Sequence, residues 1–105
     1  MEELDSINTF KKNCQTTINL LNACVDAKIK NFIYASGHIV YDSSHYLPID
    51  ENHPLNPTTN YGLSKLINEN FCKLFSQHDI NFTILRISSV FGIGQKERFV
   101  IPTLI

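Results

Sequence analysis

The chain has 105 residues, of which 43% are hydrophobic and 18% charged, and its formal net charge is -1 at pH 7. This composition is typical of one small globular domain, and it excludes a disordered chain and a basic stripe for nucleic acid. Because it shows no signal peptide and no apolar run long enough to span a bilayer, we expect a cytoplasmic protein without a membrane partner.

The three cysteines, Cys14, Cys24 and Cys72, form no C-x-x-C pair. An odd number of cysteines without a secretory signal predicts free thiols in a reducing compartment. The four histidines share no ligand spacing with these cysteines, so we expect no metal site.

The first element is an amphipathic helix from about residue 6 to residue 27. Its apolar residues recur at steps of three and four, and Asp5 or Ser6 can cap its start. Asn13 lies beside the apolar stripe, either as a polar residue at the helix border or as an amide that positions an active-site water. The stripe comprises Ile7, Phe10, Cys14, Ile18, Leu21 and Val25.

The next segment, residues 32–36, is a short apolar run that ends at Gly37. It shows no polar alternation, which predicts a strand covered on both faces, as in a parallel sheet. Residues 42–59 contain Pro48, Pro54 and Pro57 among polar residues and predict a long ordered loop. Loops of this length are usually functional.

A second amphipathic helix is expected from about residue 60 to residue 77, followed by a strand over 82–87 and a new apolar segment over 99–105. Helices and strands that alternate predict α/β architecture with parallel strands and right-handed crossovers. In such sheets ligands bind beyond the carboxyl ends of the strands. Ser36 and Ser88/Ser89 lie at those ends, and Tyr61 opens the helix between them.

Tyr61 and Lys65 are four residues apart and therefore share one face of the second helix. An ammonium about 4 Å from a phenolate stabilises it by roughly 4 kcal/mol at an effective dielectric constant near 20. The pair can thus serve as a proton donor and acceptor. Taken alone, the same spacing is also typical of an exposed helical turn.

Four motifs in order over nearly the whole chain resemble the extended short-chain dehydrogenase/reductase family, whose members include the nucleotide-sugar epimerases and dehydratases. Residues 13–21 (N-C-Q-T-T-I-N-L-L) resemble the N-V-x-G-T-x-N-L-L helix, and residues 32–41 resemble the F-I-Y-x-S-S-x-x-V-Y strand. Glu51, Pro54, Pro57 and residues 61–65 (Y-G-L-S-K) fit the E-x-x-P-x-x-P-x-x-x-Y-G-x-S-K block. Residues 85–95 resemble L-R-x-x-N-V-Y-G-P-x-Q.

The resemblance implies a partial Rossmann-like, doubly wound parallel sheet and an NAD-dependent oxidoreductase chemistry on a nucleotide sugar, with NADP as the alternative cofactor. Tyr61 would be the catalytic acid/base, and Lys65 would assist it and hold the nicotinamide ribose. Asn13 and Ser88 would contact the cofactor and Ser89 the sugar. Either an epimerase or a dehydratase fits, and His38-Ile39, where dehydratases carry acids, favour an epimerase.

Two departures from the family pattern qualify this expectation. The family's catalytic serine or threonine aligns with Gly37, and Ser36 replaces it only if the backbone bulges, because in a regular strand neighbouring side chains point to opposite faces. His38 is a further candidate donor. Losing one such donor costs roughly 10²–10³ in turnover.

The family's Gly-rich turn for the pyrophosphate is the second departure, because the sequence has no G-x-x-G-x-x-G. We therefore expect residues 1–105 to be the central part of an epimerase/dehydratase domain, without the Gly-rich dinucleotide-binding unit and without the C-terminal substrate region. NAD(H) should bind weakly or not at all, and the monomer should be marginal or aggregating, with exposed apolar patches that mark the absent sheet partners. The alternative function is a non-catalytic remnant, or a subunit completed by another chain or by a homo-oligomer.

Overall fold

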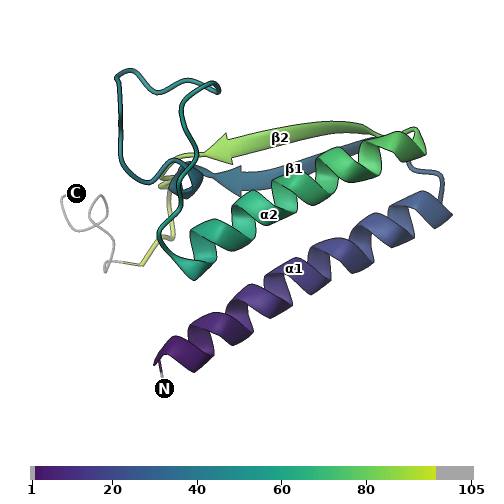
Figure 1. Cartoon of the computed structure of the whole chain (residues 1–105), viewed down its shortest axis with the longest axis horizontal. Coiled ribbons are helices and arrows are strands. Elements are labelled where there is room, and N and C mark those ends of the chain that lie inside the picture. Colours follow the sequence, from purple (N-terminus) through teal and green to yellow (C-terminus); the bar gives the residue numbers. More distant parts are fainter. Residues whose placement is uncertain (1, 97–105) are drawn as a thin grey trace.

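The computed structural model describes residues 2–96, with side chains from residue 5 onward. The helix α1 (Glu2–Asp26) leads into the strand β1 (Asn31–Gly37) and the 3-10 turn η1 (His38–Val40). After a long loop, the helix α2 (Asn60–Phe75) continues into the 3-10 turn η2 (Ser76–His78) and the strand β2 (Asn81–Ile87) (Figure 1). The expected order of helix, strand, helix and strand is confirmed, whereas the expected element over 99–105 lies outside the described residues.

The two helices begin differently from each other. Because α1 already begins at Glu2, the expected cap at Asp5 or Ser6 is wrong, and the Ser6 hydroxyl instead accepts a hydrogen bond of 2.8 Å from the Asn60 amide. The helix α2 has an N-cap at Thr59, whose side chain accepts the backbone N–H of Gly62 at 3.0 Å. A threonine cap satisfies one of the free N–H groups of the first helical turn and fixes where α2 starts.

The strands β1 and β2 pair in parallel, from Asn31 opposite Asn81 to Gly37 opposite Ile87. This confirms the parallel sheet. One face of the sheet packs against α2, and on that face the rings of Phe32 and Phe82 meet edge to face with their centroids 5.5 Å apart. The helix α1 packs on α2, so both helices lie on the same side of the sheet (Figure 1).

The opposite face of the sheet is open. Ile33 is 67% exposed, Leu85 45% and Ile87 43%. The expectation that the strands are covered on both faces is therefore wrong for the described residues, because α2 packs on the other face and α1 packs on α2. The expected exposed apolar patch is confirmed. An apolar face of this kind marks a surface that favours contact with further protein.

The loop over residues 42–59 has a packed centre of its own, His53, which is 2% exposed. Its ring Nε2 accepts the backbone N–H of His45 at 2.9 Å, and its Nδ1 lies 2.9 Å from the carbonyl oxygen of Pro54. The rings of Tyr41 and Tyr46 lie 5.4 and 4.7 Å from the His53 ring between centroids. A buried polar ring with both nitrogens paired costs little to bury, and here it organises the long loop.

Candidate active site

Tyr61 and Lys65 lie in the first two turns of α2, where the Thr59 cap places them at the helix start. The structure brings the two side chains together, with the Lys65 Nζ 5.6 Å from the centroid of the Tyr61 ring. Tyr61 is 52% exposed, so its ring and hydroxyl are open to a ligand. An accessible phenol beside an ammonium is one of the arrangements that can exchange a proton with a ligand.

The ammonium of Lys65 is held from the side of the sheet. Its Nζ donates a hydrogen bond of 2.9 Å to the backbone carbonyl of Ala35 in β1, and it lies 5.4 Å from the centroid of the Tyr34 ring. A lysine ammonium has three N–H donors. Because the Ala35 carbonyl takes one, the other two remain available for a ligand or for Tyr61.

Gly62 allows the start of α2 to lie against the turn that follows β1. A Cβ atom at this position would be 3.0 Å from the Cβ of Pro57 and 3.2 Å from the carbonyl oxygen of Ile39. Such contacts are too short for any side chain to fit without movement of its neighbours. The glycine in the Y-G-x-S-K block is therefore required by packing next to Tyr61.

Asn13 connects α1 to this part of α2. Its Nδ2 donates to the Ser64 hydroxyl at 3.3 Å, and that hydroxyl donates to the backbone carbonyl of Tyr61 at 2.7 Å. Ser64 is fully buried. Asn13 thus reaches the tyrosine through one intermediate side chain, which supports the backbone of the candidate site.

Ser36 is not brought beside Tyr61. Gly37 has extended dihedral angles (φ -151°, ψ 159°) and stays in register opposite Ile87, so the strand runs to its end without the bulge that Ser36 would need. The Ser36 side chain instead faces α2, where its buried hydroxyl donates to Glu69 at 2.6 Å. The regular alternation of the strand accounts for this placement.

Glu69 and Arg86 form a buried ion pair that the sequence motifs did not indicate. The Arg86 Nε and Nη2 donate to the two carboxylate oxygens of Glu69 at 3.0 and 2.8 Å, and the Glu69 side chain is fully buried. Burial raises the pKa of Glu69, but the hydrogen bonds from Arg86 and Ser36 outweigh burial and hold it below its ordinary value. The hydrogen bond with Glu69 likewise raises the pKa of Arg86.

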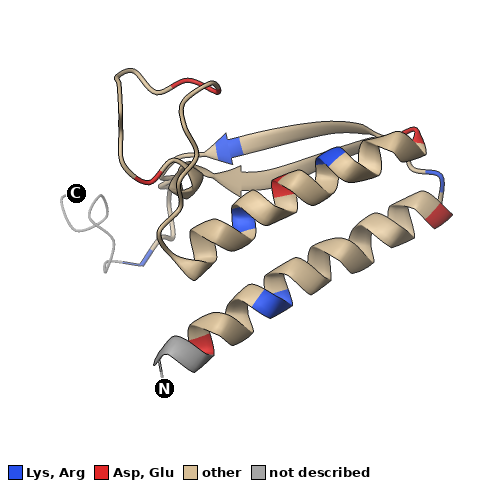
Figure 2. Cartoon of the chain, in the orientation of Figure 1, with Lys and Arg blue, Asp and Glu red and all other residues tan. Residues whose placement is uncertain are grey.

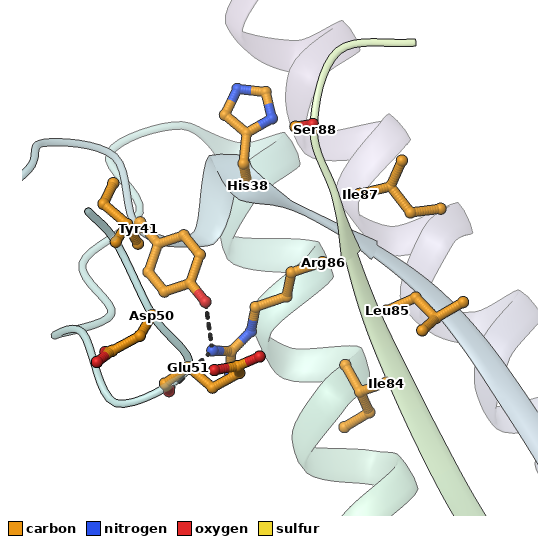
Figure 3. A pocket seen from close by; sticks show the side chains of 10 residues that line it. His38, Tyr41, Asp50, Glu51, Ile84, Leu85, Arg86, Ile87 and Ser88 are labelled. Carbon is orange, nitrogen blue, oxygen red and sulfur yellow. Dashed lines mark hydrogen bonds between the residues drawn. The ribbon is translucent and has the colours of Figure 1, made fainter. Parts of the chain in front are cut away.

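Arg86 also joins the long loop to the sheet. Its Nη1 donates to the Tyr41 hydroxyl at 3.0 Å and to the backbone carbonyl of Glu51 at 3.3 Å. Figure 3 shows the bond to Tyr41 as a dashed line. A guanidinium presents five donors in a plane, so one arginine can bind a carboxylate and the loop together. Two signals in the sequence could have found the pair: Glu69 follows Tyr61 and Lys65 at a further four-residue step, and Arg86 is a charge inside an apolar strand.

A cavity of about 930 Å³ lies between the long loop and β2. It is lined by the predicted cofactor residue Ser88, together with His38 and Arg86 (Figure 3). Tyr61 is not among the residues that line it, and Ser89 is exposed. Ser88 and His38 thus line one cavity, and Tyr61 does not line it.

Neither helix within residues 2–96 combines the length and apolar character needed to cross a bilayer. The charges of this part of the chain are scattered and form no basic stripe. Among the Lys, Arg, Asp and Glu residues, the loop over 42–59 contains only acidic ones (Figure 2).

The expected free thiols are confirmed for all three cysteines, and burial raises the pKa of Cys72 to about 11. Among the described residues no group of histidine, cysteine and acidic side chains could hold a metal ion.

The family model of the NAD dependent epimerase/dehydratase family matches residues 2–105. The chain therefore belongs to this family. The match confirms the resemblance found in the motifs, and with the parallel α/β arrangement it confirms a partial Rossmann-like fold.

Among curated proteins, the chain is 44% identical over 85 residues to a "Putative UDP-glucose 4-epimerase" of Methanocaldococcus jannaschii. This match covers 79% of the chain and 28% of the relative, so the chain spans less than a third of that protein. A putative epimerase from Burkholderia cenocepacia has a similar structure (TM-score 0.86, 28% identity, 95% of this chain and 33% of that chain). The UDP-glucuronic acid 4-epimerase of Bacillus cereus, solved in complex with NAD, is also similar (TM-score 0.75, 31% identity, 83% of this chain and 28% of that chain).

Proposed function

We propose that this chain carries the proton-transfer part of an NAD-dependent nucleotide-sugar epimerase. The observation that supports this most directly is the exposed Tyr61 with Lys65 beside it at the capped start of α2. The family membership and the epimerase names of its relatives support the reaction class. A nucleotide sugar is then the substrate.

In this proposal Tyr61 exchanges a proton with a hydroxyl of the sugar. The phenolate takes the hydroxyl proton as the sugar carbon is oxidised, and the phenol returns a proton when the carbon is reduced from the other face. Lys65 stabilises the phenolate, and an ammonium about 4 Å away contributes roughly 4 kcal/mol at an effective dielectric constant near 20. A bound NAD would supply the hydride acceptor for the oxidation and the hydride donor for the reduction.

The donors left free at this site suit the ribose of the cofactor. The Lys65 ammonium has two N–H groups not taken by the Ala35 carbonyl, and they match the hydroxyl acceptors of a ribose. Asn13 and Ser88 are proposed as further cofactor residues and Ser89 as a sugar contact. NADP is the alternative cofactor.

The site still needs a side chain that donates a hydrogen bond to the reacting oxygen of the sugar. Gly37 has no side chain, and Ser36, predicted as a catalytic and substrate-binding residue, has its hydroxyl committed to Glu69. We therefore propose that Ser36 serves the site by holding Glu69. His38 is exposed at the end of β1 and lines the same cavity as Ser88, and we propose it as the replacement donor.

A second function is favoured by the open face of the sheet. Ile33, Leu85 and Ile87 expose an apolar surface there. In this alternative the chain is non-catalytic by itself and needs another chain, or another copy, to complete the cofactor site. If another copy completes the site, sedimentation of the purified chain should show self-association. A monomer that unfolds in one sharp transition would count against this second function.

The proposed chemistry is tested by Tyr61→Phe in the assembly that contains this chain and turns over a UDP-sugar. Loss of an acid/base group lowers turnover by about 10²–10⁴, which the interconversion of UDP-glucose and UDP-galactose measures. Tyr46→Phe is the matched control, because Tyr46 is also a partly exposed tyrosine but its hydroxyl only donates to Asp50 in the loop. Retained turnover in Tyr61→Phe would remove Tyr61 from the catalytic role.

A further inference from the structure

The ammonium of Lys65 lies between two aromatic rings. Its Nζ is 5.4 Å from the centroid of Tyr34 and 5.6 Å from the centroid of Tyr61. Both distances fall within the roughly 6 Å over which a ring face attracts a cation. The family motifs explain Tyr61 and Lys65 but give no role to Tyr34.

Tyr34 is fixed in place by a buried amide. The Asn68 Nδ2 donates to the Tyr34 hydroxyl at 3.0 Å and to the backbone carbonyl of Asn13 at 3.4 Å, and Asn68 is 2% exposed. This amide connects β1, α2 and α1 at one point. The Tyr34 ring therefore has little freedom to move away from Lys65.

The Ala35 carbonyl completes the arrangement. It is the next residue of β1, and it accepts the Lys65 ammonium at 2.9 Å. A long lysine side chain on a helix surface normally samples many rotamers, and holding it in one costs entropy. Here one hydrogen bond and one ring face from the same strand restrict it to the side where Tyr61 lies.

We propose that Tyr34 is a positioning residue, whose ring holds the Lys65 ammonium against the Ala35 carbonyl and within reach of Tyr61. The inference deepens the proposed function and rests on it for its catalytic meaning. Burial raises the pKa of Tyr34, so its phenol stays protonated and does not compete with Tyr61 as a base.

The ring and the hydroxyl of Tyr34 have separable roles in this arrangement. The ring faces the ammonium, whereas the hydroxyl accepts from Asn68. Tyr34→Phe keeps the ring and loses the hydroxyl, and Tyr34→Leu loses both. Phe32→Leu is the matched control, because Phe32 is an aromatic residue of the same strand and face whose ring packs on Phe82.

The test is the NMR spectrum of the full chain with labelled lysine. A group over an aromatic ring face resonates upfield, so the terminal methylene protons of Lys65 should lie upfield of those of Lys73, an exposed lysine two turns further along α2. Tyr34→Leu should move them toward Lys73 without reaching it, because the Tyr61 ring remains. Tyr34→Phe and Phe32→Leu should keep the upfield shift.

The proposal is overturned if Lys65 resonates with Lys73 in the unmodified chain, or if Tyr34→Leu and Phe32→Leu change the Lys65 shift equally. The second result would show that any loss of packing in β1 releases the lysine. This spectrum needs neither substrate nor cofactor. Its failure is therefore distinguishable from failure of the proposed function, which the turnover of Tyr61→Phe tests.

Discussion

Two charged residues on the same helix, Lys65 and Glu69, are four residues apart and have opposite surroundings. Lys65 has one protein hydrogen bond and lies beside an exposed tyrosine. Glu69 is fully buried, and its oxygens accept three hydrogen bonds from Ser36 and Arg86. The difference teaches that a charge saturated by its own chain supports the fold, whereas a charge with donors to spare can act on a ligand.

The largest effect on stability is expected from Glu69→Gln. This change leaves the Arg86 guanidinium buried without its carboxylate, and breaking a buried pair by removing one partner costs about 3–5 kcal/mol. Urea unfolding followed by circular dichroism gives the free energy of unfolding. If the variant loses less than about 1 kcal/mol, the pair is not the structural centre that its burial indicates.

A smaller effect is expected from Gly62→Ala. The added Cβ would lie 3.0 Å from the Pro57 Cβ and 3.2 Å from the Ile39 carbonyl oxygen. Overpacking of this kind costs about 1–3 kcal/mol, offset in part by the better helix propensity of alanine. Gly92→Ala is the control, since a Cβ there would meet nothing within 4 Å. Equal unfolding free energies for the two variants would refute the close approach of α2 to η1.

The stability of the chain should also depend on pH through Glu69. Its folded pKa is lowered, so its contribution is fully present above the unfolded value of about 4.3 and is lost as the pH falls through the folded pKa. The difference in unfolding free energy between the unmodified chain and Glu69→Gln should therefore be constant from about pH 7 to pH 5 and shrink below about pH 4. A difference that grows toward acid would have the wrong sign.

The smallest effect is expected from Asp79→Asn. Asp79 pairs with Lys30, and the hydrogen bond from Lys30 lowers its pKa, but both side chains are exposed. Exposed pairs contribute little because water and salt screen them. Asparagine also tolerates the left-handed backbone at this position (φ 61°). Unfolding measured at low and high salt should barely distinguish the variant, and a loss comparable to that of Glu69→Gln would contradict the contrast between buried and exposed charges.

Much of this arrangement could be predicted from the sequence, because local patterns specify it. Apolar periodicity gave the elements within a few residues, and the spacing of Tyr61 and Lys65 placed both on one helical face. The strand alternation already indicated that Ser36 points away from the site unless β1 bulges. These features depend on residues that are close in sequence, and a sequence motif includes such residues.

The remaining features depend on how β1 and β2 cross α2. Glu69 meets Arg86 across 17 residues, and Asn68 meets Tyr34 across 34. No local pattern reports such contacts, and Arg86 in an apolar strand was compatible with an exposed edge. An exposed apolar patch was expected, but an apolar run does not tell which of its two faces the same chain covers.

The most direct test compares Tyr61→Phe and Glu69→Gln in one preparation of the assembly that turns over a UDP-sugar, with turnover and urea unfolding measured on both. The different surroundings of the two turns of α2 predict that one variant loses turnover and the other loses stability. Tyr61→Phe should lose about 10²–10⁴ in turnover with unchanged unfolding, and Glu69→Gln should lose about 3–5 kcal/mol of stability. If Tyr61→Phe keeps its turnover, or loses it in proportion to its stability, the assignment of the acid/base role to Tyr61 is contradicted.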